Sequence, residues 1–274
     1  MKQISKIWAL QITLGALLLN SCEQSQVEVA AISAEEVAVE AKANQISDQS
    51  VDIVDQFVQE EENKQAGKSI INSFFNPCVS ATISNDTNVT SIELDFGDGC
   101  TLENGHVAAG QIFITVMTES QVSREINYTY QDFSLSGNLI EGGGKIIRVK
   151  ENANANPQST FTADVAIQLE DSGVLVNRSI AKTREWIAGV GTGTWTDNVY
   201  LVTGSWTSQT SNGFSKSAEV TQELTRRLDC PIFVSGVVSL ARNNRSGELN
   251  YGEGECDSLA TLTVNGNDYT IYID

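Results

Sequence analysis

From about residue 70 onward, this chain alternates apolar and polar side chains with a period of two. In the clearest run, residues 161–169, the apolar members are Phe161, Ala163, Val165, Ile167 and Leu169. Because successive side chains of a strand point to opposite faces, this pattern predicts antiparallel strands with one buried face and one wet face. No stretch from 70 to 274 keeps a helical period long enough for a typical helix.

Seven further runs show the same alternation: 111–117, 126–130, 145–150, 174–182, 199–203, 219–226 and 269–273. Turn-forming residues separate the runs, among them Asn104-Gly105, Gly142-Gly143-Gly144 and Asn265-Gly266. The alternation slips between Tyr130 and Phe133, which predicts a bulge at Gln131-Asp132. We therefore expect residues 70–274 to form an all-β domain, an antiparallel meander folded as a sandwich or as a strongly coiled sheet.

Residues 22–69 differ in composition and predict an acidic tether with short helices. Residues 23–68 hold eleven acidic residues against three lysines and no proline. Ser33-Ala34-Glu35-Glu36 has the spacing of a capping box, which predicts a helix from there to about residue 43. Apolar residues at helical spacing predict a second helix over about 50–64. One interpretation is a solvated acidic stalk; the other is a helix that docks on a partner.

An internal repeat relates the two ends of the β domain. The segment Glu93–Cys100 matches Glu248–Cys256 with one inserted residue, and each copy follows a cysteine next to a proline. We interpret residues 77–117 and 229–274 as related hairpin units, in which a strand ends in a glycine-rich turn.

The amino terminus has the order of a secretory signal peptide. Lys2 and Lys6 precede an apolar stretch from residue 7 to 19, and Leu19-Asn20-Ser21-Cys22 follows. The stretch is too short to cross about 30 Å of hydrocarbon. Its ending resembles the lipobox of bacterial lipoproteins, which implies removal of residues 1–21, lipidation of Cys22 and a palmitate-bearing anchor. The alternative is an ordinary signal peptide cut nearby, with Cys22 as a spare thiol.

The carboxyl-terminal third carries a second resemblance. Three segments are involved: Cys230 to Gly236, Tyr251 to Asp257, and Thr263 to Tyr269. Together they resemble uncharacterised cell-envelope lipoproteins of flavobacteria and their relatives. The resemblance implies an envelope β protein, most naturally at the outer membrane, and implies no activity; whether it faces the periplasm or the surface stays open.

Four cysteines remain beside Cys22: Cys78, Cys100, Cys230 and Cys256. An even number in an oxidising compartment predicts disulfides, and proximity along the chain favours Cys78–Cys100 and Cys230–Cys256 among three possible connectivities. A zinc site built from all four is the alternative, but the chain has no Cys-x-x-Cys pair.

Charge restricts the partners. The formal net charge is −18, and residues 1–21 contribute two lysines and no acid. Such a surface repels phosphate backbones and anionic headgroups, so we expect no nucleic acid and a membrane contact through acyl chains alone. The remaining partner hypotheses are a glycan or another envelope protein, and we expect no cofactor.

Acidic residues gather at the two repeated turns and suggest two kinds of chemistry. Asp95 and Asp98 lie in one turn, and Glu253 and Asp257 lie in the other. Oxygen ligands on a glycine-rich turn suit Ca2+, but the same residues are favoured in turns for backbone reasons alone, and no known calcium-loop spacing occurs. A carboxylate hydrolase around Glu253 and Asp257 is a further hypothesis.

Trp186, Trp195 and Trp206 lie about one hairpin apart. On one exposed face they would stack on sugar rings; otherwise they fill the core. His106, the one histidine, follows Asn104-Gly105 and is expected to be a solvated turn residue. With no catalytic set recognised, the expected function is a non-enzymatic structural or binding role for a membrane-anchored envelope lipoprotein. Carbohydrate binding or adhesion through these tryptophans is the alternative.

Overall fold

The structure is a computed structural model that describes residues 32–118, 120, 122–243 and 245–273. It contains one α-helix, α1, Ala34–Gln65, and a short 3-10 turn, η1, Trp195–Asp197. The strands are β1 Ser80–Asp86, β2 Val89–Asp95, β3 Cys100–Thr101, β4 Val107–Thr118, β5 Ser123–Leu135, β6 Asn138–Val149, β7 Gln158–Gln168, β8 Leu175–Ala188, β9 Val199–Thr210, β10 Ser215–Arg227, β11 Phe233–Arg242, β12 Arg245–Glu253, β13 Leu259–Val264 and β14 Asn267–Tyr272.

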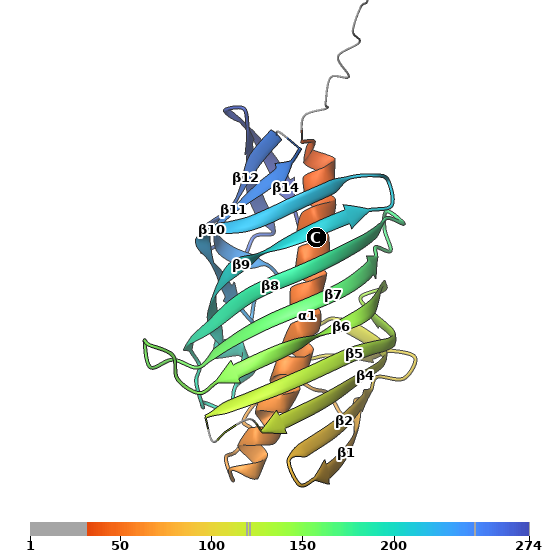
Figure 1. Cartoon of the computed structure of the whole chain (residues 1–274), viewed down its shortest axis with the longest axis vertical. Coiled ribbons are helices and arrows are strands. Elements are labelled where there is room, and N and C mark those ends of the chain that lie inside the picture. Colours follow the sequence, from red (N-terminus) through yellow and green to blue (C-terminus); the bar gives the residue numbers. More distant parts are fainter. Residues whose placement is uncertain (1–31, 119, 121, 244, 274) are drawn as a thin grey trace, which may run out of the picture. The chain divides into compact units, whose positions relative to one another are not determined.

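All of the strands belong to a single antiparallel sheet. Its order follows the chain from β1 to β14, except that the short β3 pairs with β4 beside the main path, so β1 and β14 are the edges. Figure 1 shows β5 to β9 crossing obliquely over α1, with β11, β12 and β14 turned out of the plane of these strands. The prediction of an all-β meander is confirmed, and the architecture is the strongly coiled sheet.

Each predicted strand run overlaps an observed strand and extends at most one residue beyond it, while most of the observed strands are several residues longer. The predicted bulge is also confirmed, because the β5–β6 register shifts between Thr129 and Phe133 and Asp132 has a positive φ of 47°. The turn predicted at residues 142–144 is wrong, since these glycines lie inside β6. A Cβ on Gly143 would stand 2.1 Å from the carbonyl oxygen of Tyr128, so close strand contact explains the glycine there.

Helix α1 is one continuous element. The predicted start is confirmed, because the Glu36 amide donates a hydrogen bond to Ser33 Oγ at 3.1 Å. The prediction of two short helices is wrong, and so is the interpretation of this segment as a solvated stalk. Every residue from Ala43 to Val58 is buried, so more than four turns have no wet face. The rest of the predicted tether before residue 32, with Cys22, lies outside the described residues.

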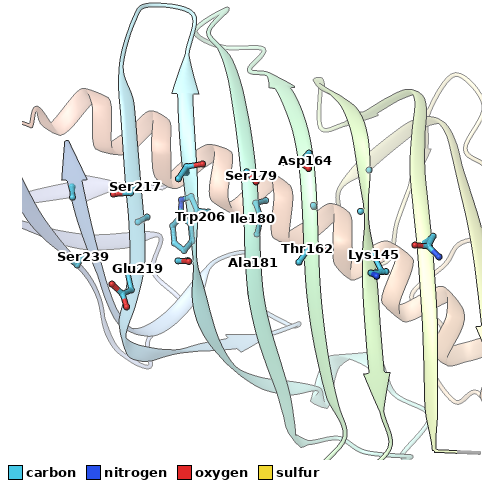
Figure 2. A pocket seen from close by; sticks show the side chains of 18 residues that line it. Lys145, Thr162, Asp164, Ser179, Ile180, Ala181, Trp206, Ser217, Glu219 and Ser239 are labelled. Carbon is cyan, nitrogen blue, oxygen red and sulfur yellow. The ribbon is translucent and has the colours of Figure 1, made fainter. Parts of the chain in front are cut away.

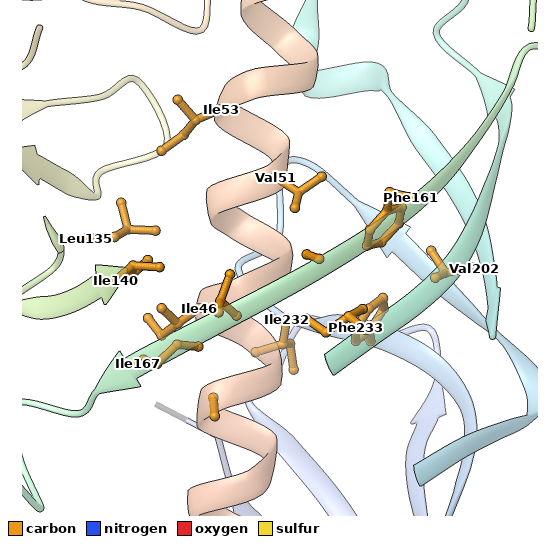
Figure 3. Packing of buried hydrophobic residues seen from close by; sticks show 14 of the residues in the cluster. Ile46, Val51, Ile53, Leu135, Ile140, Phe161, Ile167, Val202, Ile232 and Phe233 are labelled. Atoms are coloured by element: carbon orange, nitrogen blue, oxygen red, sulfur yellow. The ribbon is translucent and has the colours of Figure 1, made fainter. Parts of the chain in front are cut away.

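The core fills the space between α1 and the inner face of the sheet. Figure 3 shows Ile46 and Val51 of the helix among Phe161, Ile167 and Val202 from the strands. Ile53 lies on another side of the helix in the same view, so apolar side chains leave the helix in more than one direction. This arrangement explains the buried helix: a coiled sheet can cover several sides of it.

The two repeated turns have the same local structure. In each, the side chain of the Asx residue accepts a hydrogen bond at 2.8 Å from the amide of a glycine two residues later: Asp95 with Gly97, and Asn250 with Gly252. The aromatic residue between them is buried and packs edge-to-face on another ring, Phe96 on Phe133 and Tyr251 on Phe233. The repeat therefore specifies a shared turn as well as a shared sequence.

Candidate functional site

A polar stripe runs along the buried helix. Its members recur every fourth residue: Glu36, Glu40, Asn44, Asp48, Asp52, Gln56 and Glu60. Four residues turn a helix by slightly more than one full turn, so the stripe winds slowly around α1 and meets successive strands. A buried carboxylate needs a charged or hydrogen-bonding partner, so the sheet or its adjoining loops must supply one for each carboxylate of the stripe.

Strand β8 supplies three of those partners from its inner face. Arg178 donates to Glu40 Oε1 at 3.0 Å, Lys182 to Asp48 Oδ2 at 2.7 Å, and Arg184 to Asp52 Oδ1 at 2.7 Å. All three cations are buried and follow the same alternation as Val176 and Ile180. The inner face of β8 is therefore half apolar and half cationic.

Other strands supply cations for the remaining helix carboxylates, in the middle of the helix and toward both ends. Asp52 also accepts from Arg226 of β10 at 2.9 Å, so one carboxylate joins two guanidinium groups. Glu36 Oε1 accepts from Arg242 of β11 at 2.7 Å. Near the other end, Arg148 of β6 pairs with Asp55 and with Glu62. These bonds connect the helix to four strands.

Burial perturbs the titration of the inner cations. Desolvation lowers the pKa of Lys182 to about 8, although Asp48 opposes the shift. It also lowers the pKa of Arg178 below its ordinary value, against the attraction of Glu40. For Arg184, burial would lower the pKa, but the neighbouring carboxylates, Asp52 first, hold it above the ordinary value.

The tryptophans singled out from the sequence face the core. Trp206 is 4 % exposed, and its Nε1 donates to Glu40 Oε1 at 2.7 Å while Lys182 Nζ lies 4.5 Å from its ring centroid. Trp195 is 7 % exposed and packs edge-to-face on Phe74. Trp186 is half-buried. The structure does not bring the three rings onto one open face, and the core interpretation describes Trp195 and Trp206 better than a stacking platform does.

The cysteines pair as predicted. Disulfides join Cys78 to Cys100 and Cys230 to Cys256, across loops of 22 and 26 residues. In both bridges the member next to the sheet, Cys100 or Cys230, is 1 % exposed. Each bridge therefore attaches an outer loop to the core.

The four acidic residues considered for calcium binding or hydrolysis do not come together at one site. Asp95 and Asp98 are at one end of the sheet path, while Glu253 and Asp257 are near the other; Asp95 and Asp257 accept bonds from nearby backbone amides. Among the described residues, no group of three or more His, Cys, Asp or Glu is arranged to hold a metal ion.

His106 lies after the predicted turn and is half-buried. Its Nδ1 is 3.0 Å from Ser136 Oγ. Partial burial lowers the pKa of its imidazole below the ordinary value.

The outer face of the sheet has a broad, open hollow of about 730 Å3, which we name the outer groove. Figure 2 shows it spread over neighbouring strands, with Thr162, Ser179 and Ser217 among its lining residues. Its charged members are Lys145, Asp164 and Glu219. A surface rich in hydroxyls with mixed charge suits contact with a neutral polar partner.

A second hollow, of about 490 Å3, lies beside the carboxyl-terminal end of α1. We name it the cationic pocket, because Lys68, Arg124, Arg148 and Lys150 line it. It is built from the helix end, from the ends of β5, β6 and β8, and from the loops beside them. Sequence reasoning missed it, since its residues are scattered from 59 to 191 and form no motif.

Sequence reasoning also missed the helix–sheet ion pairs, although two signals were present. One was the acidic or amide residue at every fourth position of 36–60, with acids at five of the seven positions. The other was the presence of arginine and lysine in the run 174–184 at alternate positions that otherwise hold apolar residues, namely 178, 182 and 184. Each signal is ambiguous alone, and the two together predict a buried contact.

Comparison with family models, with curated proteins and with solved structures finds no match to this chain. Within the described part of the chain, no helix is both long and apolar enough to span a membrane.

Proposed function

We propose that this chain is a lipid-anchored protein of the cell envelope that binds an envelope component or a small ligand without catalysing a reaction. The observation that carries the anchor is the sequence Leu19-Asn20-Ser21-Cys22 behind a short apolar stretch. The disulfide-linked β body is consistent with an oxidising compartment. Outer-membrane attachment, facing either the periplasm or the surface, belongs to the same proposal.

A binding role is supported by the burial of the helix–sheet ion pairs, which leaves their charged groups out of reach of a ligand. The inner carboxylates and cations form fixed helix–sheet pairs, such as Glu40 with Arg178, and these groups are 3 % and 0 % exposed. Such pairs are held by the fold and are closed to a substrate. The hollows that the body opens to solvent include the outer groove and the cationic pocket.

Metabolic labelling tests the anchor. Labelled palmitate should enter the wild-type protein and vanish in Cys22→Ala, while Ser25→Ala should keep the label. Label that persists in Cys22→Ala, or reduced thiols in protein recovered from the cytosol, would refute the anchored envelope role. Turnover of a glycan panel that disappears in Glu253→Gln with Asp257→Asn would instead establish the hydrolase hypothesis.

Carbohydrate binding is kept as a second candidate because the outer groove is lined by hydroxyls. Its contacts would come from residues such as Thr162 and Ser205; Trp206 also lines the groove, but it is only 4 % exposed and its ring is not open for stacking. Oligosaccharides should then bind without changing the quenching of Trp195 and Trp206 by acrylamide. Strong protection of these two rings by a sugar would restore the stacking hypothesis.

A further inference from the structure

The cationic pocket reverses the charge of the molecule locally. The whole chain carries −18, with 35 acidic residues against 17 lysines and arginines. Yet four cations line this one hollow, and Glu62 is the only acidic residue among its lining residues. An acidic protein that gathers cations around a hollow creates a local attraction for anions.

Two of the four cations have fixed partners. Arg148 Nη1 lies 3.1 Å from Glu62 Oε2 and also pairs with Asp55, while Arg124 Nε lies 3.7 Å from Glu62 Oε1. Both guanidinium groups share the same glutamate. Glu62 is therefore already neutralised, and it does not offset the two remaining cations.

The other two cations, Lys68 and Lys150, are exposed and form no ion pair with any described residue. Lys42 and Arg245 are the only other described cations without an ion pair, and both are half-buried. Lys68 Nζ lies over Gly191, 3.9 Å from where a Cβ would stand. The side chains of Lys68 and Lys150 therefore line the same hollow, and neither ammonium group is neutralised by an ion pair.

Apolar side chains form the rest of the wall. Val122 is 62 % exposed and Val190 is 50 % exposed, and both line the pocket. Trp186 contributes its ring, which stacks on Tyr200 at 5.9 Å between centroids and is held in place from behind. Exposed apolar groups beside unpaired cations favour a ligand that has both a charge and an apolar body.

We infer that the cationic pocket binds a small organic anion, a carboxylate or phosphate attached to an apolar body. Lys68 and Lys150 hold the anionic group, and Val122, Val190 and Trp186 contact the body. The volume of about 490 Å3 fits a ligand of this class. The inference rests on the binding role proposed above and names the chemistry of the ligand.

Equilibrium dialysis of the full chain tests this with naphthoate, naphthyl phosphate and the neutral analogue naphthylmethanol. At least one anion should bind ~tenfold more tightly than the alcohol, which corresponds to about 1.4 kcal/mol. Lys68→Gln with Lys150→Gln should remove most of that preference. The matched control, Lys42→Gln with Arg245→Gln, makes the same charge change away from the pocket and should alter anion affinity less than about twofold.

Three results would overturn the inference: no anion binding, equal binding of anion and alcohol, or the same loss in both double variants. The unfolding midpoint of each variant shows that a loss does not come from misfolding. Mass spectrometry of the recovered ligand separates this inference from the proposed function. Chemical conversion of a bound anion would end the non-enzymatic proposal and leave the pocket in place, whereas failure to bind would leave the lipid anchor untouched.

Discussion

The two faces of strand β8 differ in the kinds of side chain that they present, although both belong to the same backbone. Its inner face alternates Val176 and Ile180 with buried Arg178, Lys182 and Arg184. Its outer face presents small residues such as Ser179 and Ala181 at the outer groove. The difference shows that inward positions of a strand need not be apolar when the element they face is acidic. The buried charges specify where the helix lies, and the outer face is left free for contact.

The largest expected loss of stability comes from removing the charge of Asp52, the helix carboxylate that pairs with two arginines of the sheet. Asp52→Asn leaves Arg184 and Arg226, which are 3 % exposed, without their carboxylate. Loss of one partner of a buried pair costs about 3–5 kcal/mol, and here two guanidinium groups depend on it. Urea unfolding measures the change in the free energy of unfolding.

Asp164→Asn on the outer face is the matched control, because Asp164 is exposed and forms no ion pair with a described residue. It should change the free energy of unfolding by less than ~0.5 kcal/mol. Equal effects of the two substitutions would mean that the inner pairs do not hold the helix.

Removing a disulfide should have the next largest effect. Cys230→Ser with Cys256→Ser releases a loop of 26 residues, which is expected to cost about 3 kcal/mol. The bridge adjoins Pro231, whose carbonyl accepts from Gln49 Nε2 at 2.9 Å, so helix contact should also loosen. Hydrogen exchange of α1 amides reports that loosening. The double variant Cys78→Ser with Cys100→Ser is the comparison; faster exchange there than in the first variant would contradict this assignment.

Raising the pH should stabilise the inner face through Lys182. Its pKa is about 8 in the folded protein and about 10.4 in an unfolded chain, so between these values the unfolded chain binds a proton that the folded one lacks. The free energy of unfolding should therefore rise with pH over this window, by ~1 kcal/mol per unit at most. Denaturant unfolding from about pH 7.5 to 9.5 measures the slope.

Lys182→Arg keeps the positive charge but does not titrate in this range, so its slope should be smaller than that of the wild type. Lys216, whose pKa burial also lowers, contributes in the same direction to both proteins. Above about pH 10 the slope should turn, because burial raises the pKa of Tyr200 and the folded protein then holds the extra proton. Identical slopes in wild type and Lys182→Arg would exclude Lys182 as the source.

The smallest effect is expected at an exposed pair. Arg227 Nη2 lies 2.6 Å from Asp229 Oδ2, but the two side chains are 40 % and 37 % exposed. Solvent screens such pairs, so Arg227→Gln should cost less than ~1 kcal/mol. A loss as large as that of Asp52→Asn, measured in the same urea series, would remove the distinction between inner and outer charges.

Much of this architecture was predictable from local patterns. The strands around Phe161 and the start of α1 at Ser33 follow from period-two alternation and from capping, which depend on neighbours in the chain. The disulfide partners follow from proximity along it. The turn assigned to residues 142–144 was wrong because glycine marks close backbone approach as well as turns, and only the neighbouring strands tell the two apart.

The candidate sites were less predictable. Trp206 looks like a possible ligand platform in the sequence, but Glu40 and Lys182 on other elements bind its edge and its face. The cationic pocket joins Lys68, after the helix, to Lys150 at the end of β6. No spacing rule relates two such positions, so only the folded chain could bring them together.

By itself, the sequence determined the eight predicted strand runs, the helix start, the turn chemistry of the repeat and the cysteine pairs, because each depends on short-range geometry. Tertiary structure decided that the acidic helix is buried. An acidic segment remains in water unless something compensates the cost of desolvating its carboxylates. Here the compensation comes from cations on strands far along the chain, such as Arg178, which is 138 residues from Glu40. That contact exists only after the sheet has coiled around the helix.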